Sequence, residues 1–283
     1  MNKTIKIKKM NKIVVFMSFL LVALLVTSSC ATDDNQTVAT FTELVWQDEF
    51  DTEGTVNPEN WTHEIGTGTN GWGNNELEYY TDRSENATVQ NGLLVISAKN
   101  EEFNGSSYTS ARIITKGKFE QTHGRFEARI KLPSGQGIWP AFWLLGDDSN
   151  GSEVWPQIGE IDIMENVGDE PTKIFGTVHG PGYSGGESIG KPYELQNDRF
   201  DTGFHVFGIE WGQNYINYYV DDVLYNQITP DDVTGEWVFN DGPFYIILNV
   251  AVGGSYPGSP NASTVFPQNM LVDYVRVYKN SNN

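Results

Sequence analysis

The sequence predicts an all-β fold in which two antiparallel sheets pack face to face. A period of two dominates the pattern of apolar and polar residues: one segment alternates strictly, which is typical of a strand with one buried and one exposed face, and four more are strand-like. Glycine (29 residues) and proline (12 residues) interrupt the chain often, and no segment has the apolar periodicity of an amphipathic helix. Strands without helices bury their apolar faces most readily against a second sheet.

The first 29 residues have a composition of their own. Residues 1–12 carry five lysines and no acid, and an apolar run from Ile13 to Val26 follows, which ends in small residues. This run is shorter than the roughly 20 residues of a membrane-spanning helix. The pattern predicts a secretory signal peptide over residues 1–29. An N-terminal helix that stays attached as an anchor is the alternative.

Cys30 is the only cysteine, so no intrachain disulfide can form, and it directly follows the apolar run. Its position resembles the acylated cysteine of bacterial lipoproteins, and the acids in CATDDN resemble the surface-export signal of Bacteroidetes lipoproteins. We therefore expect an exported lipoprotein at the cell surface or outer membrane that touches the membrane only through its N-terminal lipid. A freely secreted protein is the alternative.

The remainder of the chain shows no break in composition. Residues 30–40 are small and polar and predict a tether, residues 41–279 predict a single domain, and residues 280–283 form a short tail. A single sandwich can hold about 240 residues. A domain of this size buries around 70% of its unfolded surface and needs no disulfide. We expect a monomer.

The charge of the chain limits its partners. The full chain has 18 basic and 37 acidic residues, and five of the basic residues precede Cys30. The rest of the chain therefore carries 13 basic residues and a formal charge of −24. Such a surface repels nucleic acid, anionic lipid and sulfated polysaccharides. Neutral polymers remain as binding partners.

The individual strands follow from their alternation. In GRFEARIKL, four apolar residues from Phe126 to Leu132 alternate with four charged residues, so one face is dry and the other wet. Asp221 and Asp222 separate two strand-like runs and suit a hairpin turn. The strand-like segments in chain order are NGLLVISAK (91–99), GRFEARIKL (124–132), FHVFGIEW (204–211), YINYYVDDVLYNQ (215–227) and MLVDYVRVY (270–278).

The segment GEIDIMENVG (159–168) breaks this alternation. Glu160 and Asp162 share one face of a regular strand, but Glu165 falls on the opposite face with the isoleucines. Burying an unpaired carboxylate there costs several kcal/mol or forces it neutral. A β-bulge at Ile163–Met164 returns Glu165 to the outer face, since one extra residue reverses the alternation. The sequence therefore predicts a row of three acids on one bulged strand.

Such a row suits glycoside hydrolysis. The backbones of its outer members lie roughly 13 Å apart along the strand, and inward-leaning side chains can reach the ~5–5.5 Å of a retaining glycosidase. One carboxylate would attack the sugar carbon, while the other protonates the departing oxygen and then deprotonates water. Three acids this close keep a proton near neutral pH. A solvated acidic strand and a calcium site made of the same oxygens are the alternatives.

The surrounding motifs resemble a known family. WPQIGEIDIMENVG, preceded by GIWPAFWLLG, closely resembles the signature of glycoside hydrolase family 16, and within it the bacterial β-1,3-glucanases called laminarinases. The E-x-D-x-x-E motif with methionine inside it and the two-tryptophan segment upstream are quite specific. The resemblance covers nearly all of the mature chain through DEFD, GWGNNELEYYT, NGLLVISA, ARIITKGKFEQTHGRFEARIKLP and DYVRVY.

This resemblance implies a β-jelly-roll sandwich of two antiparallel sheets with an open cleft on its concave face. By match of motif position, Glu160 would be the nucleophile, Glu165 the acid/base and Asp162 the assisting acid. The implied reaction is endo-cleavage of β-1,3-glucan (laminarin) with retention of configuration, with mixed-linkage β-1,3-1,4-glucan as a side activity. The resemblance implies no redox or nucleotide cofactor.

The resemblance also implies sugar-binding positions. Trp139, Trp143 and Trp155 flank the acids in sequence, and flat aromatic rings suit the apolar faces of pyranoses. Core packing is the alternative for one or two of them. Asn74 and Arg112 match positions that grip sugar hydroxyls in the family, with loop packing and an exposed charge as the alternatives.

Two further positions lie near the implied cleft. His179 in TVHG would follow the acid strand, although a lone histidine is often a satisfied structural residue. Laminarinases commonly read GGNWPG where this chain has GGSYPG (253–258), so Tyr256 offers a smaller and more polar platform. Linkage preference is therefore open. A Gly/Pro turn without a ligand role is the alternative for this stretch.

Many family members carry a structural calcium ion on the convex side, and Glu49, Gly92 and Asp273 match its ligand positions. Backbone carbonyls and a carboxylate suit this oxygen-seeking cation, with Glu49 contributing its carbonyl. The resemblance thus implies a site that braces the termini, away from the chemistry. Ordinary strand-edge acids are the alternative.

Other functions stay open at this level. The same scaffold can serve lichenan, agarose or carrageenan, but the acidic surface disfavours carrageenan, and lichenases usually have a regular acid strand. A non-catalytic glycan-binding jelly roll is an alternative from another class, although it would not need three intact acids. Net transglycosylation shares the covalent intermediate and differs only in its products.

Overall fold

The computed structural model describes residues 40–147, 151 and 154–280. The predicted signal peptide, Cys30 and nearly all of the predicted tether and tail lie outside these residues. Within the described part, no helix is long and apolar enough to cross a membrane. The named helical segments are η1 (Gly71–Asn75), a π-helical turn, and η2 (Gly185–Glu187), a 3-10 turn.

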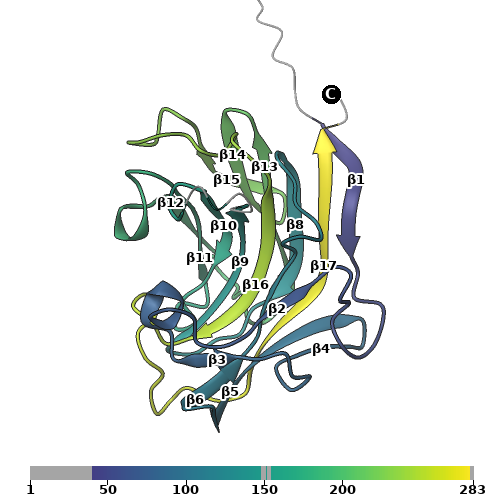
Figure 1. The fold of residues 1–283 in the computed structure, drawn as a ribbon, viewed down its shortest axis with the longest axis vertical. Helices are drawn as coiled ribbons and strands as arrows, with labels where there is room; N and C mark the ends of the chain where they lie inside the picture. Colours follow the sequence, from purple (N-terminus) through teal and green to yellow (C-terminus); the bar gives the residue numbers. More distant parts are fainter. Residues whose placement is uncertain (1–39, 148–150, 152–153, 281–283) are drawn as a thin grey trace, which may run out of the picture. The chain divides into compact units, whose positions relative to one another are not determined.

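Two sheets make up the described part of the chain, as the sequence predicts (Figure 1). The larger one has ten strands in the order β15-β14-β13-β8-β17-β5-β6-β3, while β1 also pairs with β17 and β4 with β5. All of its pairings are antiparallel except that of β3 with β6. Its strands are β1 (Phe41–Asp48), β3 (Glu78–Tyr80), β4 (Ala87–Gln90), β5 (Leu93–Phe103), β6 (Ser106–Ser110), β8 (Gly124–Lys131), β13 (His205–Gly212), β14 (Tyr215–Val220), β15 (Val223–Ile228) and β17 (Gln268–Asn280).

The second sheet is fully antiparallel and has seven strands in the order β12-β11-β10-β9-β16-β7-β2. It carries the acid strand, β10, near its middle. Its strands are β2 (Thr62–Glu64), β7 (Arg112–Ile114), β9 (Ile138–Gly146), β10 (Glu160–Glu165), β11 (Lys173–His179), β12 (Ile189–Glu194) and β16 (Phe244–Val252).

The core between the sheets follows the predicted alternation. In β8, Phe126, Ala128 and Ile130 are completely buried, while the charged residues between them lie on the other side of the sheet. Moving each large apolar side chain out of water contributes roughly 1.5–3 kcal/mol. The hairpin turn also forms as predicted, because Asp221 and Asp222 adopt positive φ angles of 49° and 62° between β14 and β15.

Strand β16 is buried along its whole length. Phe244 and Leu248 belong to the main core, whereas Tyr245 and Ile247 form a second small cluster with Ile114 on the opposite side of the sheet. The seven-stranded sheet therefore has an apolar patch on its outer side as well.

The bulge in β10 is confirmed. Strand β9 pairs Trp143 with Asp162 and Phe142 with Met164, so Ile163 has no opposite partner. On the other side, the register with β11 also shifts between Asp162 and Glu165. Ile163 and Met164 are both buried. Two successive side chains are therefore packed in the core before Glu165 points outward.

Candidate active site

The bulge aligns the acids with side chains of neighbouring strands on the outer side of the seven-stranded sheet, which we call the site face. Directly opposite residues in antiparallel strands point to the same side of a sheet. The register therefore defines three rows that cross the site face: His179, Glu160, Leu145 and Tyr245; Thr177, Asp162, Trp143 and Ile247; and Phe175, Glu165, Ala141, Asn249, Arg112 and Glu64.

Two of the predicted tryptophans contact the acids directly. The Trp139 indole N–H donates to Glu165 Oε1 at 3.0 Å, and the Trp155 indole N–H donates to Glu160 Oε2 at 2.8 Å. Trp155 is 44% exposed, so a large part of its side chain remains available to a ligand. Each glutamate of the row thus has one indole donor, and such a donor favours the ionised carboxylate.

His179 faces the acids in a defined tautomer. Its Nε2 lies 3.1 Å from Asp162 Oδ2 and 3.7 Å from Glu160 Oε1. Its Nδ1 accepts the backbone N–H of Gly185 at 3.0 Å. Since an accepting ring nitrogen carries no proton, the imidazole is neutral and its proton lies on Nε2, the ring nitrogen on the side of the acids. Sequence analysis identified His179 but not Gly185, whose amide comes from the loop after β11.

The three acids titrate above their ordinary ranges. Burial, followed by the charge of Asp162, raises the pKa of Glu160 to about 8. The hydrogen bond from the Trp155 N–H acts in the opposite direction and lowers this pKa. Burial also raises the pKa of Asp162, which is only 3% exposed. Burial, followed by the charges of Asp162 and Glu160, raises the pKa of Glu165 well above that of a free glutamate. The row therefore retains protons near neutral pH, as expected of closely spaced acids.

Arg112 is held from three sides. Its Nε donates to Glu64 in an ion pair, and its guanidinium lies 4.6 Å from the ring centre of Trp72 and 4.8 Å from that of Trp143. Cation–π contacts and a carboxylate together fix the plane of the guanidinium. Trp72 takes a positive φ of 53° to reach this position, which is a strained conformation for a bulky residue. The site face thus holds Arg112 as an oriented hydrogen-bond donor.

A chain of hydrogen bonds links the loop that contains η1 to the sheet. Asn74 Nδ2 donates to Glu76 Oε1 at 3.2 Å, and the Tyr80 hydroxyl donates to Glu76 Oε2 at 3.0 Å. Asn249 Nδ2 donates to the Tyr80 oxygen at 3.2 Å, and Trp143 Nε1 donates to Asn249 Oδ1 at 2.8 Å. Sequence analysis missed Glu76, Tyr80 and Asn249. The one available signal was Asn249 itself, the only polar residue in the apolar run FYIILNVAV.

Tyr256 belongs to the same neighbourhood. It is 45% exposed, and its ring meets Trp139 edge-on with 5.3 Å between the ring centres. The backbone N–H of Ser255 donates to the Asn74 carbonyl at 2.7 Å, which ties this turn to the η1 loop. The structure thus brings Tyr256, Trp139 and Asn74 together at one end of the acid row.

The acid row has the composition of a metal site, but the histidine tautomer opposes one. Glu160, Asp162 and His179 place possible ligand atoms within 4.8 Å of one another. A metal would need the lone pair of His179 Nε2, which carries the ring proton while Nδ1 accepts from Gly185. We therefore assign the group to proton chemistry.

The predicted calcium positions converge on the other sheet. Strand β17 pairs with β5 up to Val272 and with β1 from Val275, so Asp273 lies where its partner changes. Gly92 directly precedes β5 and Glu49 directly follows β1. Both carboxylate oxygens of Glu49 pair with Arg276, which leaves its carbonyl for a cation, and one oxygen of Asp273 pairs with Arg129. The donor set fits an oxygen-coordinated cation.

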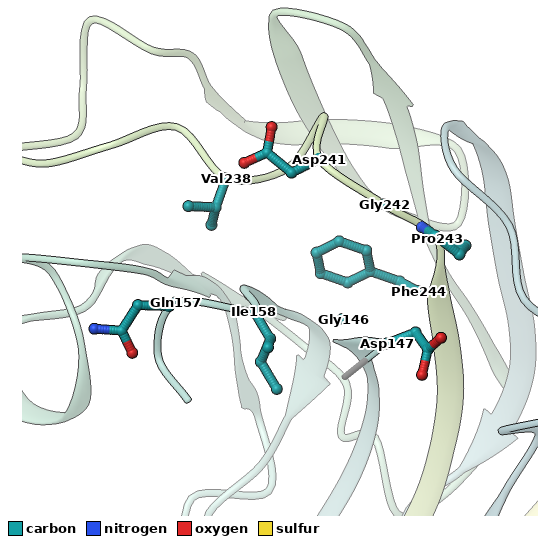
Figure 2. A pocket seen from close by; sticks show the side chains of 9 residues that line it. All are labelled: Gly146, Asp147, Gln157, Ile158, Val238, Asp241, Gly242, Pro243 and Phe244. Carbon is teal, nitrogen blue, oxygen red and sulfur yellow. The ribbon is translucent and has the colours of Figure 1, made fainter. Parts of the chain in front are cut away.

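A small pocket lies where β9 ends and β16 begins. It is lined by residues that include Gly146, Gln157 and Gly242, and Figure 2 shows the ring of Phe244 pointing toward the side of Val238 and Ile158. None of the predicted catalytic or sugar-binding residues lines it. This pocket therefore does not contribute to the acid row.

Known proteins share both the fold and the sequence. The family described as Glycosyl hydrolases family 16 matches residues 73–276. The β-glucanase of Rhodothermus marinus is 44% identical over an alignment of 285 positions, which covers 97% of this chain and 96% of that protein. The catalytic domain of an endo-1,3-β-glucanase (laminarinase) from Thermotoga petrophila RKU-1 superposes with a TM-score of 0.81 and 50% identity over 87% of this chain and 100% of that one.

A relative with a different named specificity also matches. An endo-1,3-1,4-β-glycanase of Rhizobium meliloti (strain 1021) is 34% identical over 220 residues, covering 73% of this chain and 44% of that protein. A β-jelly-roll sandwich with three aligned acids among tryptophans defines the protein class as a glycosidase. The chain belongs to glycoside hydrolase family 16.

Proposed function

We propose that this chain is a retaining endo-glycosidase that hydrolyses β-1,3-glucan. The observation that carries the proposal is the bulge in β10, which puts three acids on one face with an indole donor on each glutamate. Similarity to an endo-1,3-β-glucanase supports the substrate class. The acidic balance of the chain agrees with a neutral polymer.

In the first step, we assign the attack on the anomeric carbon to the carboxylate of Glu160. The bond from that carbon to the glycosidic oxygen breaks, and the proton of Glu165 passes to the departing oxygen. A covalent glycosyl-enzyme results. In the second step, Glu165 takes a proton from water, whose oxygen attacks the same carbon and frees Glu160.

The neighbours of the two glutamates support this division of roles. Glu160 meets the Trp155 N–H at 2.8 Å and lies near the Nε2 proton of His179, and both favour its ionised form. Glu165 is raised in pKa by burial and by the two other acids, which suits a proton donor. His179 Nε2 lies closer to Asp162 Oδ2, at 3.1 Å, than to Glu160. Asp162 would assist by influencing which of the two glutamates is ionised.

Replacement of the nucleophile tests the proposal. Glu160→Ser should abolish release of reducing ends from laminarin, because no covalent intermediate can form, while circular dichroism and the melting curve stay those of a folded protein. A matched Glu127→Gln variant, altered on the ten-stranded sheet, should keep the activity of the parent. Unchanged hydrolysis by a folded Glu160→Ser enzyme would contradict the assignment. Binding of laminarin by the parent without any hydrolysis would instead support a glycan-binding protein.

Mixed-linkage β-1,3-1,4-glucan is the second candidate substrate. The similarity to an endo-1,3-1,4-β-glycanase favours it, and Tyr256 offers a smaller platform than a tryptophan beside Trp139. A panel of laminarin, lichenan, agarose and carrageenan, with products sized over time, separates these specificities and also distinguishes hydrolysis from transglycosylation.

We further propose that Glu49, Gly92 and Asp273 hold a structural calcium ion. The change of partner along β17 supports this, since it brings the ends of β1 and β5 to one point of β17. We also propose export as a monomer with a lipid on Cys30, supported by the basic start and apolar run before that cysteine.

A further inference from the structure

Glu78 is a buried carboxyl that the proposed chemistry does not use. It lies in β3, next to the network that holds Asn74 and Trp143, and its side chain has 0% exposure. Its Oε2 accepts the backbone N–H of Val252 at 2.6 Å. No N–H or O–H group of the described residues donates to its Oε1, which is also buried.

A second carboxyl lies close to Glu78. Glu76, two residues earlier in the chain, is within hydrogen-bonding reach of its side chain. The backbone brings the two residues to the same point, since Glu78 accepts the Val252 N–H and Glu76 forms a β-bridge with Gly253. Two carboxyl groups can share a hydrogen bond only when one of them carries a proton, since ionised carboxylates are acceptors alone. Both oxygens of Glu76 already accept hydrogen bonds, from Asn74 and from Tyr80, whereas Glu78 Oε1 is buried without a donor. The proton therefore belongs to Glu78.

The charges around the pair agree with this assignment. Among its ionisable neighbours, Glu76 acts most strongly on Glu78, and it disfavours ionisation. Tyr80 lies within electrostatic reach of both acids, and the positive charge of Arg112 acts on Tyr80. Strand β16 contributes the Val252 amide and the neutral Asn249 to this network. Burial raises the pKa of Glu78 well above the usual value, and the Glu76 charge raises it further.

Glu76 connects Glu78 to the site face. Its two oxygens receive Asn74 and the Tyr80 hydroxyl, and Tyr80 in turn receives Asn249, which fixes the Trp143 indole. If Glu78 lost its proton, the Glu76 carboxylate would lose a donor and would be repelled by the new negative charge. It would then move away from Asn74 and Tyr80.

We propose that Glu78 is a positioning residue that keeps its proton at working pH and donates it to Glu76, thereby holding Asn74 and Trp143 in place for the sugar. This inference deepens the proposed function and rests on it. Its readout is substrate binding rather than the chemical step, because neither Glu78 nor Glu76 contacts the acid row in any described hydrogen bond.

A pair of variants of similar size tests the donor role. Glu78→Gln keeps an acceptor for Val252 and an N–H donor for Glu76, so KM and kcat on laminarin should stay within about twofold of the parent at neutral pH. Glu78→Met cannot donate, and KM should rise by about tenfold with kcat little changed, which corresponds to one lost hydrogen bond to a charged group. Equal KM values for the folded Met and Gln variants would overturn the proposal.

The pH dependence provides a second, independent readout. As pH rises through the pKa of Glu78, the parent loses the donor and gains a repelling charge, so KM should increase on the alkaline side. Glu78→Gln has no proton to lose, and its KM should stay flat over the same range. An alkaline rise of equal size in both enzymes would contradict the proposal. Glu127→Gln serves as the control and should follow the parent.

Infrared difference spectroscopy observes the proton directly and does not depend on activity. The parent minus Glu78→Gln spectrum at neutral pH should contain the carbonyl stretch of a protonated carboxylic acid. A spectrum with only carboxylate bands would refute a proton on Glu78. If neither enzyme cleaves laminarin, the proposed function fails instead, and the infrared result still decides the protonation state.

Discussion

At the scale of the residue, the environment of each acid decides its role. Glu160 and Glu165 have the same side chain and each receives one indole N–H, yet only Glu165 has its pKa raised by the charges of both other acids. His179 carries its proton on Nε2, 3.1 Å from Asp162 Oδ2, and that tautomer is fixed by the Gly185 amide. Proton placement in the row therefore depends on groups from three different segments.

The raised pKa values of the row predict a cost in stability at alkaline pH. A carboxyl whose folded pKa exceeds its unfolded value, roughly 4.3 for glutamate, stabilises the fold most at low pH and loses that contribution as pH rises through the folded pKa, which is about 8 for Glu160. Glu165→Gln removes one such charge. Its Tm at pH 8 should exceed that of the parent by about 2–4 °C, with activity lost and with a smaller difference at pH 5.

Calorimetry across this pH range checks the prediction. The sign follows from burial: the ionised form of Glu165 is the unfavourable one inside the protein. A lower Tm for the variant at pH 8 than for the parent would mean that the ionised row stabilises the fold.

At the scale of the element, the bulge in β10 makes the site possible. Without the extra residue, Glu165 would point between the sheets with Ile161 and Ile163, which are buried. The bulge instead buries Ile163 and Met164 in succession and puts Glu165 opposite Ala141 and Phe175. The packing of two apolar side chains thus sets the direction of a carboxylate.

Truncation of Met164 should therefore affect both stability and turnover. Met164→Ala leaves a cavity beneath the bulge and should cost about 2–5 kcal/mol in the free energy of unfolding. It should also lower kcat, because Glu165 follows directly in the chain. Met270→Ala is the matched control, since Met270 is equally buried but lies in β17.

Urea unfolding and laminarin kinetics at a temperature where both variants are folded measure these effects. We expect a similar loss of stability in the two variants and a loss of kcat in Met164→Ala alone. An equal kcat in the two folded variants would show that the bulge does not depend on the packing of Met164.

At the scale of the whole molecule, the acid row and the proposed calcium positions lie on different sheets. The seven-stranded sheet carries the acid row, while β17, the last strand of the described chain, pairs with β1, β5 and β8 in the ten-stranded sheet. In Figure 1, β1 lies beside β17 near the end of the described chain. The proposed calcium positions lie at this junction, so metal binding would act on stability and leave the acid row alone.

Chelation tests this division. Calcium at a hundredfold excess over its dissociation constant would raise Tm by about 5–10 °C in a domain of this size. EDTA should remove this gain without changing kcat at a temperature where the protein stays folded. Asp273→Asn should reduce the response to calcium. A fall in kcat that precedes unfolding would place the metal effect at the acid row instead.

Much of the architecture was predictable because it depends on local patterns. Alternation marked β8, β13 and β17, and the Asp221–Asp222 pair marked a hairpin. The misplaced Glu165 predicted the bulge, since a carboxylate on the core face is expensive. The family resemblance supplied the remaining site positions, and the structure brings Trp139, Trp155 and His179 against the acids.

Other partners were not predictable, because they depend on strand order and loop paths. Glu64 meets Arg112 only through the pairing of β2 with β7, and Asn249 reaches Trp143 through the pairing of β16 with β9. The Gly185 amide and the Glu78 carboxyl act through contacts that leave no trace in local periodicity.

The sequence by itself determined the two-sheet class, the kinked acid strand and the family, because alternation and the cost of burying charge act between near neighbours in the chain. The tertiary structure alone decided which protons the acids keep and which groups orient the side chains proposed to bind sugar. Those properties depend on burial and on donors brought together from distant segments, and such distances exist only once the strands have paired.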